Sequence, residues 1–160
     1  PVLIKFNLES NELYFKDSTG REMIALEGLV KRIDFLNASG KDSNYTIFEA
    51  GYPAIDKQNQ NYFYQLSAEG RVKLLVKKSK QIETDKNLLS GEIRKQFSET
   101  AITLYIFKDN EIIFLRPNKN ALVALLKDRE ELITAYINTN KINFKKIPDL
   151  VKVIRYYNDN

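Results

Sequence analysis

The chain has 160 residues, of which 43% are hydrophobic and 29% are charged, with 25 Lys and Arg against 21 Asp and Glu. This length favours one domain over residues 1–160, large enough to fold without a metal ion or a disulfide. Since there is no Cys and no His, a disulfide and a thiolate zinc site are excluded, and the commonest general base is missing. We therefore expect a protein that is not an enzyme and that holds neither a cofactor nor a metal.

The first part of the chain predicts short antiparallel strands. Apolar and polar residues alternate over residues 2–8 and again over 12–16, on either side of a polar turn at 9–11. A second turn at 17–20 consists of Asp, Ser, Thr and Gly, which are residues that turns favour. Further strands are expected over residues 23–26 and 29–36.

The middle of the chain predicts another hairpin. A polar loop at 37–44 leads into a strand over 45–49, and strands over 62–66 and 71–77 flank the turn sequence Ser-Ala-Glu-Gly. Alternation divides the side chains of the last strand between two faces, with Val72, Leu74 and Val76 on one and Lys73, Leu75 and Lys77 on the other.

Residues 81–99 have the least regular pattern. Their Asp-Lys-Asn and Ser-Gly clusters predict an irregular crossing loop, with one helical turn around 93–97. Loops of this length inside a compact domain are uncommon and often functional.

Residues 101–140 form the centre of the predicted fold. Strands over 102–107 and 112–115 flank a polar turn, and from about Asn120 the apolar period changes from two to 3.6 residues. The resulting amphipathic helix is expected to bend near Asp128, because Asp128 and Glu131 have the spacing of a capping box. A last helix begins at Pro148, and its apolar stripe is Leu150, Val153, Ile154 and Tyr157.

These elements together predict an α+β fold. Residues 1–115 are expected to be mainly β, as an antiparallel meandering sheet resembling a half-barrel, and residues 116–160 to be mainly α, as amphipathic helices packed on it. The longest purely apolar run, 121–126, is far shorter than the roughly 20 residues of a membrane-spanning helix. We therefore expect no transmembrane segment in this chain.

The densest positive charge follows the aromatic strand at 62–64. The basic residues of this region could form a stacking platform for nucleic acid together with those rings: Arg71, Lys73, Lys77, Lys78 and Lys80. Alternatively, Lys on a solvent-facing strand keeps a sheet edge soluble. The second interpretation is favoured because the net charge is only +4 and acidic residues are dispersed along the chain. No nucleic-acid partner is expected.

Acidic residues also occur in groups. Asp128, Glu130 and Glu131 could suggest an acid–base or metal site, but helical residues two apart do not face each other, so a solvated helix face is favoured. Asp56 and Glu69 flank the aromatic strand and could meet in space, although no pattern in the sequence brings them together.

The aromatic residues have two interpretations, which both stay open. Alternation would place half of the rings on an outward face, where Tyr is favoured in protein interfaces; they could equally pack on the sheet under a loop. The first interpretation defines a candidate interaction surface made of Tyr52, Tyr62, Tyr64, Arg71, Lys73, Lys77 and Lys78.

Several segments carry a resemblance to a known group of proteins: Phe-Glu-Ala-Gly-Tyr-Pro at 48–53, Asp56, Phe-Tyr-Gln-Leu at 63–66, Gly-Arg-Val-Lys-Leu-Leu at 70–75 and Tyr156-Tyr157-Asn158. This pattern resembles an uncharacterised family of secreted, periplasmic proteins of the Bacteroidota. The resemblance implies an exported protein and supplies no catalytic residues. Since the chain begins at Pro1 rather than Met, we expect an export signal to have been removed.

The leading hypothesis is therefore a non-enzymatic interaction module of the cell envelope that binds another envelope protein through exposed aromatic residues and the segment 81–99. A specific version is a periplasmic accessory or plug subunit of an outer-membrane machine such as the type nine secretion translocon. The alternative is a half-barrel that binds a small ligand or a lipid, which requires an apolar cavity between sheet and helices. An enzyme that uses carboxylates is the third class, disfavoured by the missing His.

Overall fold

The computed structural model describes residues 3–36, 45–86 and 91–160, and the polar loop predicted at 37–44 lies outside them. The chain divides into two compact units, residues 1–30 with 78–102 and residues 31–77 with 103–160. We call them unit 1 and unit 2 and describe each by itself. The single domain over residues 1–160 stays a prediction.

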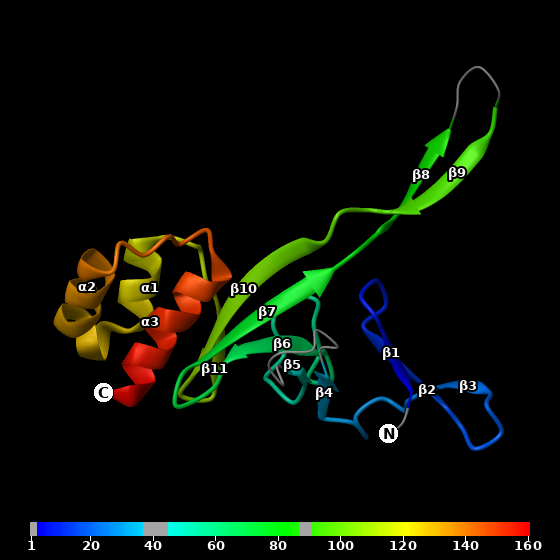
Figure 1. Cartoon of the computed structure of the whole chain (residues 1–160), viewed down its shortest axis with the longest axis horizontal. Helices are drawn as coiled ribbons and strands as arrows, with labels where there is room; N and C mark the ends of the chain where they lie inside the picture. Colours follow the sequence, from blue (N-terminus) through cyan, green and yellow to red (C-terminus); the bar gives the residue numbers. More distant parts are fainter. Residues whose placement is uncertain (1–2, 37–44, 87–90) are drawn as a thin grey trace. The chain divides into compact units, whose positions relative to one another are not determined.

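Unit 1 contains two small antiparallel sheets (Figure 1). The first has three strands in the order β1 (Ile4–Asn7), β2 (Glu12–Lys16) and β3 (Glu22–Ile24). The second pairs β8 (Ile82–Lys86) with β9 (Ile93–Phe97). The predicted turn at 17–20 is confirmed, because Gly20 has a φ of 83° and the Asp17 carboxylate accepts from the Thr19 backbone N–H at 2.8 Å.

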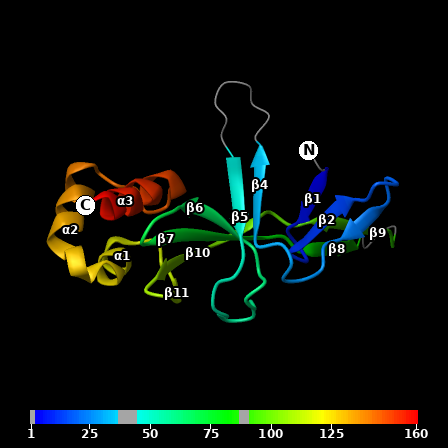
Figure 2. The same ribbon diagram turned by 90° about the horizontal axis from the view of Figure 1, so that it is seen from below.

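Unit 2 is built on a six-stranded sheet. Its order is β11 (Glu111–Phe114), β10 (Ala101–Lys108), β7 (Lys73–Ser79), β6 (Tyr64–Ala68), β5 (Tyr45–Glu49) and β4 (Arg32–Leu36). The antiparallel neighbours β4 and β5 lie side by side in Figure 2. Strands β7 and β10 cross the boundary between the units in the sequence. β7 begins in unit 2 and its last two residues belong to unit 1, whereas β10 begins in unit 1 and ends in unit 2.

Three α-helices follow the sheet. They are α1 (Lys119–Leu125), α2 (Glu130–Thr139) and α3 (Ile147–Asp159), and a single 3₁₀ turn, η1 (Lys127–Arg129), separates the first two. The α+β class with C-terminal helices is thus confirmed, as is the bend near Asp128. The antiparallel strands are divided among three sheets within the described residues, and the largest sheet is open, with β11 and β4 at its edges.

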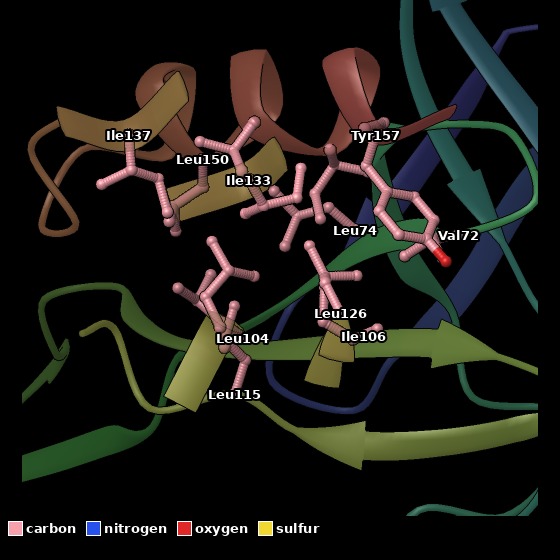
Figure 3. Packing of buried hydrophobic residues seen from close by; sticks show 14 of the residues in the cluster. Val72, Leu74, Leu104, Ile106, Leu115, Leu126, Ile133, Ile137, Leu150 and Tyr157 are labelled. Atoms are coloured by element: carbon pink, nitrogen blue, oxygen red, sulfur yellow. The ribbon is translucent and has the colours of Figure 1, made fainter. Parts of the chain in front are cut away.

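Alternation along the strands gives each face of the large sheet its own core. One face packs against the helices, and Figure 3 shows Ile133, Ile137, Leu150 and Tyr157 of the helices pointing toward Leu74, Leu104 and Ile106 of the strands. The predicted stripe of the last helix is confirmed, since Leu150, Val153, Ile154 and Tyr157 are all buried in this cluster. The other face buries Tyr52, Tyr64, Leu66, Leu75, Tyr105 and Ile112.

Three local expectations are wrong for identifiable reasons. The strand expected from residue 29 begins only at Arg32, because Leu29 donates its N–H to Leu26 in a turn. Asp128 does not cap α2: the N-cap is Arg129, without a side-chain cap. The irregular loop expected at 81–99 holds β8 and β9, and the segment expected as a helical turn is a strand.

Candidate protein-binding surface

Five members of the predicted interaction surface do come together, on the sheet face opposite the helices. The Tyr64 ring centroid lies 5.9 Å from that of Tyr52 and 5.0 Å from that of Tyr62. The ammonium of Lys73 lies 5.4 Å from the Tyr52 ring centroid, and that of Lys77 lies 5.7 Å from the Tyr62 centroid. These are distances at which a cation is attracted to the face of a ring.

This aromatic cluster is nevertheless not an exposed surface. Tyr52 and Tyr64 are 5% and 1% exposed, while Tyr62, Lys73, Lys77 and Lys78 are half-buried. The prediction that Tyr52 and Tyr64 belong to an exposed interaction surface is therefore wrong. The reason is that alternation assigns residues to a face but does not show what covers it: Tyr52 and Tyr64 belong to the second core of unit 2.

Glu49, Tyr52 and Lys73 form a partly buried polar group at one end of this cluster. Glu49 accepts from the Tyr52 hydroxyl and, at 2.9 Å, from the Lys73 ammonium. Burial raises the pKa of Glu49, but the hydrogen bonds from Tyr52 and Lys73 outweigh it, and the pKa lies below the ordinary value. The pKa of Tyr52 is raised by burial and by the Glu49 carboxylate. The group thus pairs a neutral phenol and an ammonium with one carboxylate.

Arg71 lies in a different place, in a polar cluster beside α3. Its guanidinium donates to Asp128 at 2.9 Å and also to the Tyr157 hydroxyl. Asp128 accepts in addition from Lys108 and from Tyr157, both at 2.6 Å. The interpretation of Asp128 as part of a merely solvated helix face is therefore wrong, because this carboxylate joins the sheet to α3.

Two of the segments that carry the resemblance, 70–75 and the C-terminal Tyr-Tyr-Asn, contact each other. Asn158 of the Tyr-Tyr-Asn segment accepts from the Val72 N–H at 2.9 Å and donates to the carbonyls of Val72 and Glu69 at 2.8 and 3.1 Å. The segment 70–75 and the C-terminal motif are thus parts of one packing interaction within unit 2. Their chemistry is structural.

Exposed apolar side chains lie elsewhere, and those of the β8–β9 hairpin of unit 1 share one face. Directly opposed residues of an antiparallel pair point to the same face. The register Ile82↔Phe97 and Lys86↔Ile93 therefore places Ile82, Ile93 and Phe97 on one face. Their exposed fractions are 54%, 61% and 61%. We call these three residues the apolar face of the hairpin.

Charge is distributed unequally over the two faces. The pairs Glu83↔Gln96 and Asp85↔Arg94 occupy the polar face. The apolar face also carries the pair Thr84↔Lys95. Among the side chains described for this face, Lys95 is the one charged group, and it is exposed. The hairpin is therefore amphipathic, with a cation between its apolar residues.

The described part of unit 1 buries little apolar surface. Leu13, 7% exposed, is the one buried hydrophobic residue among those described in this unit, whereas unit 2 holds two extensive clusters. A two-stranded hairpin is only marginally stable in water without a third strand or a packed face. Across the described chain, large exposed apolar side chains are also frequent in unit 1: Leu3, Met23, Ile24, Leu26, Leu29, Ile82, Ile93, Phe97 and Ile102.

The sequence does contain the signal for this hairpin. Ile93 and Phe97 are the apolar residues of 93–97, and their spacing of four fits one face of a strand as well as one face of a helical turn. A five-residue segment is too short to separate the two periods, and the Ser-Gly sequence before it favoured a loop.

Other kinds of site have less support. Two open hollows beside α1, η1 and α2, of about 1080 and 550 Å³, are lined mainly by polar side chains from those elements. Within the described ranges, acidic residues do not gather in groups of three or more that could hold a metal ion. Over the same ranges, helices with the length and apolar character needed to cross a bilayer are absent.

Comparisons of the chain with protein-family models, with curated proteins and with solved structures found no match. The resemblance to secreted proteins of the Bacteroidota stays a prediction.

Proposed function

We propose that the chain is a non-enzymatic protein-binding module and that the β8–β9 hairpin is its principal contact with the partner. The observation that carries the proposal is the apolar face of the hairpin, where Ile82 pairs with Phe97, Ile93 lies four residues further along the same face, and each of the three is more than half exposed. Apolar surface exposed on one face of a folded element favours an interaction site.

Energetics support a partner that covers this face. Full burial of a large apolar side chain contributes about 1.5–3 kcal/mol, so three such residues could supply much of a moderate affinity. The described residues of β8 and β9 pair only with each other, which leaves each strand one free edge. A partner strand added at an edge would give the hairpin the third strand it lacks.

Charge supports a protein rather than an anionic membrane as the partner. Over its two sequence segments, unit 1 has eight Lys and Arg against nine Asp and Glu, so it lacks the positive excess that anionic lipids attract. The cation between the apolar residues is Lys95. The best-fitting partner therefore presents an apolar patch with a carboxylate opposite Lys95.

The proposed place of action is the cell envelope, with an exported, periplasmic protein that binds another envelope protein. This part rests on the resemblance described above. An accessory or plug subunit of an outer-membrane machine such as the type nine secretion translocon is one form of it, since such a subunit must dock on a larger partner.

The test is a comparison of two hairpin variants. Phe97→Asp places a charge on the apolar face, and Gln96→Asp places the same charge on the polar face one residue away. We expect the wild-type chain and the Gln96→Asp variant to co-purify the same envelope protein in stoichiometric amount, and Phe97→Asp to lose it at least tenfold. Equal recovery with both variants would contradict the proposal, as would the absence of a stoichiometric protein with the wild-type chain.

A further inference from the structure

Unit 2 contains a cleft between its sheet and its last helix. The cleft has a volume of about 430 Å³ and is lined by residues of β5, β6 and α3. Its apolar side chains come from the first turns of the helix, at Ile147, Pro148 and Val151, whereas the strands present Thr46, Gln65 and Ser67 to it, because Ile47 and Leu66 point to the opposite face of the sheet. A volume of this size is within the range of small-molecule sites.

The charged side chains that line this cleft are all cations. Lys152 and Arg155 are exposed and lie on the helix side, and the lining contains neither Asp nor Glu. Lys152 donates to Asp149 at 2.8 Å, which partly neutralises it. The two hollows beside α1 and α2 differ, because carboxylates line both of them. Charge therefore favours an anion in the cleft between β6 and α3.

Strand β6 has three buried polar side-chain atoms without a hydrogen-bond partner within the described residues: Tyr64 Oη, Gln65 Oε1 and Ser67 Oγ. Of these, Gln65 and Ser67 line the cleft. A buried polar atom without a hydrogen-bond partner destabilises the fold. A β-bulge lies at the same point, since the pairing of β6 with β7 shifts register between Leu66 and Ala68. A ligand that brings an N–H donor to this strand offsets part of that destabilisation once the Gln65 side chain turns toward it.

The spacing along α3 sets the length of the ligand. Ile147, Val151 and Arg155 are four residues apart and share one face of the helix. At a rise of about 1.5 Å per residue, the apolar end of this face lies about 12 Å from the Arg155 position. Three extended residues of peptide span about 10 Å.

We propose that this cleft binds the carboxy-terminal end of a peptide. The free carboxylate meets Arg155, the apolar side chains of the last residues contact Ile147 and Val151, and the backbone N–H groups face Gln65 and Ser67. The site is independent of the proposed function of the hairpin, because it lies in unit 2 and uses other residues. Either can fail without the other.

The test is a nuclear magnetic resonance titration of the full chain with N-acetyl-Gly-Val-Leu carrying a free carboxylate. We expect shifts concentrated at the backbone amides of Thr46, Ser67 and Val151, and binding at least tenfold weaker for the same peptide with a carboxy-terminal amide. Arg155→Glu should weaken binding at least tenfold. Arg116→Glu, at another exposed arginine that lies outside the cleft lining, should leave it unchanged.

Three results would overturn the proposal. They are shifts that do not include the cleft, equal binding of the acid and the amide, and equal binding of octanoate, which has the carboxylate and the apolar chain but no N–H. A second variant protects the test from a misfolded Arg155→Glu protein. Val151→Phe keeps α3 apolar but fills the cleft, and it should also abolish the shifts at Thr46 and Ser67.

Discussion

Several charged residues link elements of unit 2 through hydrogen bonds and ion pairs. Asp128 is the clearest example, because Lys108, Tyr157 and Arg71 all donate to its carboxylate. The hydrogen bonds from Lys108 and Tyr157 lower the pKa of Asp128 to about 2. Since the side chain is 43% exposed, solvent screens these interactions and the expected contribution to stability is modest.

Replacing Asp128 by Asn should lower the free energy of unfolding by about 1 kcal/mol at neutral pH. The matched control Glu131→Gln, on the exposed part of α2, should change it by less than about 0.5 kcal/mol. Urea unfolding of the two variants and the wild type measures both values. Equal effects would contradict the assigned role of Asp128.

The same carboxylate gives a pH dependence with a defined sign. Its pKa is about 2 when folded and near 3.9 when unfolded. As pH falls through this window, the unfolded chain binds the proton first, so the contribution of Asp128 is present above about pH 4 and is lost toward pH 2. The difference in unfolding free energy between wild type and Asp128→Asn should shrink over that interval. A difference that stays constant from pH 6 to pH 2 would contradict the account.

Lys73 has a comparable role on the opposite sheet face. Its partner Glu49 is 19% exposed in its side chain and is paired at 2.9 Å. Lys73→Met removes the cation and leaves the carboxylate in a partly buried place, so we expect a loss of about 1–2 kcal/mol. Lys78→Met, on the same strand, should cost less than about 0.5 kcal/mol. Thermal unfolding of both variants decides whether the two lysines differ.

At the scale of the elements, tight turns position the strands that carry these residues. Asp109 and Asn110, with φ of 51° and 63°, form the connection between β10 and β11. Left-handed φ at both central residues is typical of a type I′ hairpin turn, which accepts Asn and Gly but not most other residues. Asn110→Ala should therefore cost about 1–2 kcal/mol. Asn110→Gly should be neutral or slightly stabilising, and calorimetry of the two variants distinguishes them.

The β6–β7 connection depends on a close approach of α3. Gly70 has a φ of 143°, and a Cβ at this position would lie 2.3 Å from the Asn158 amide nitrogen. Gly70→Ala should destabilise the fold by about 2 kcal/mol or more, because both the backbone and the Asn158 contacts must adjust. In an Asn158→Ala background, Gly70→Ala should lower the free energy of unfolding by clearly less than it does in the wild type. Additive effects in this double-mutant cycle would show that the clash is unimportant.

How far the sequence predicts these elements depends on their length and on their neighbours. The period of α3, together with Pro148 in its first turn, identified all four of its buried residues. The hairpin of β10 and β11 followed equally from alternation around a polar turn. By contrast, Asp128 was assigned to a cap by local spacing, although its partners Lys108 and Tyr157 are 20 and 29 residues away. Contacts of that separation leave no periodic pattern.

The candidate site shows the same limit in another form. Tyr52 and Tyr64 were expected on an exposed face because alternation gives the face of a residue and not what covers it. The strand β9 was missed because five residues are too few to establish a period. The binding role that the sequence suggests for residues 81–99 stays a prediction, and the sequence did not predict the geometry that pairs Ile82 with Phe97.

At the scale of the whole molecule, the two units differ in how much apolar surface they bury. Unit 2 has a core on both sheet faces, whereas the described part of unit 1 buries Leu13 alone. We expect the amides of Leu74 and Leu75 to exchange with solvent at least about a hundredfold more slowly than those of Thr84 and Lys95. Equal protection of all four amides would instead support one cooperative domain over residues 1–160.

The proposed function assigns that exposed surface of unit 1 to a partner protein. Its central claim is that the face of the hairpin that contains Phe97 is covered in the functional state, while the face that contains Gln96 is not. Adjacent residues of a strand point to opposite faces. If the partner buries only one face of the hairpin, one of two adjacent residues contacts it and the other does not.

The most direct measurement is site-specific photo-crosslinking in the cells that make the protein, with p-benzoylphenylalanine placed at position 97 or at position 96. The account predicts that position 97 crosslinks to one distinct envelope protein and that position 96 does not. Crosslinking of position 97 to unit 2 of the same chain, or equal crosslinking from both positions, would contradict the claim that the apolar face of the hairpin is a docking surface.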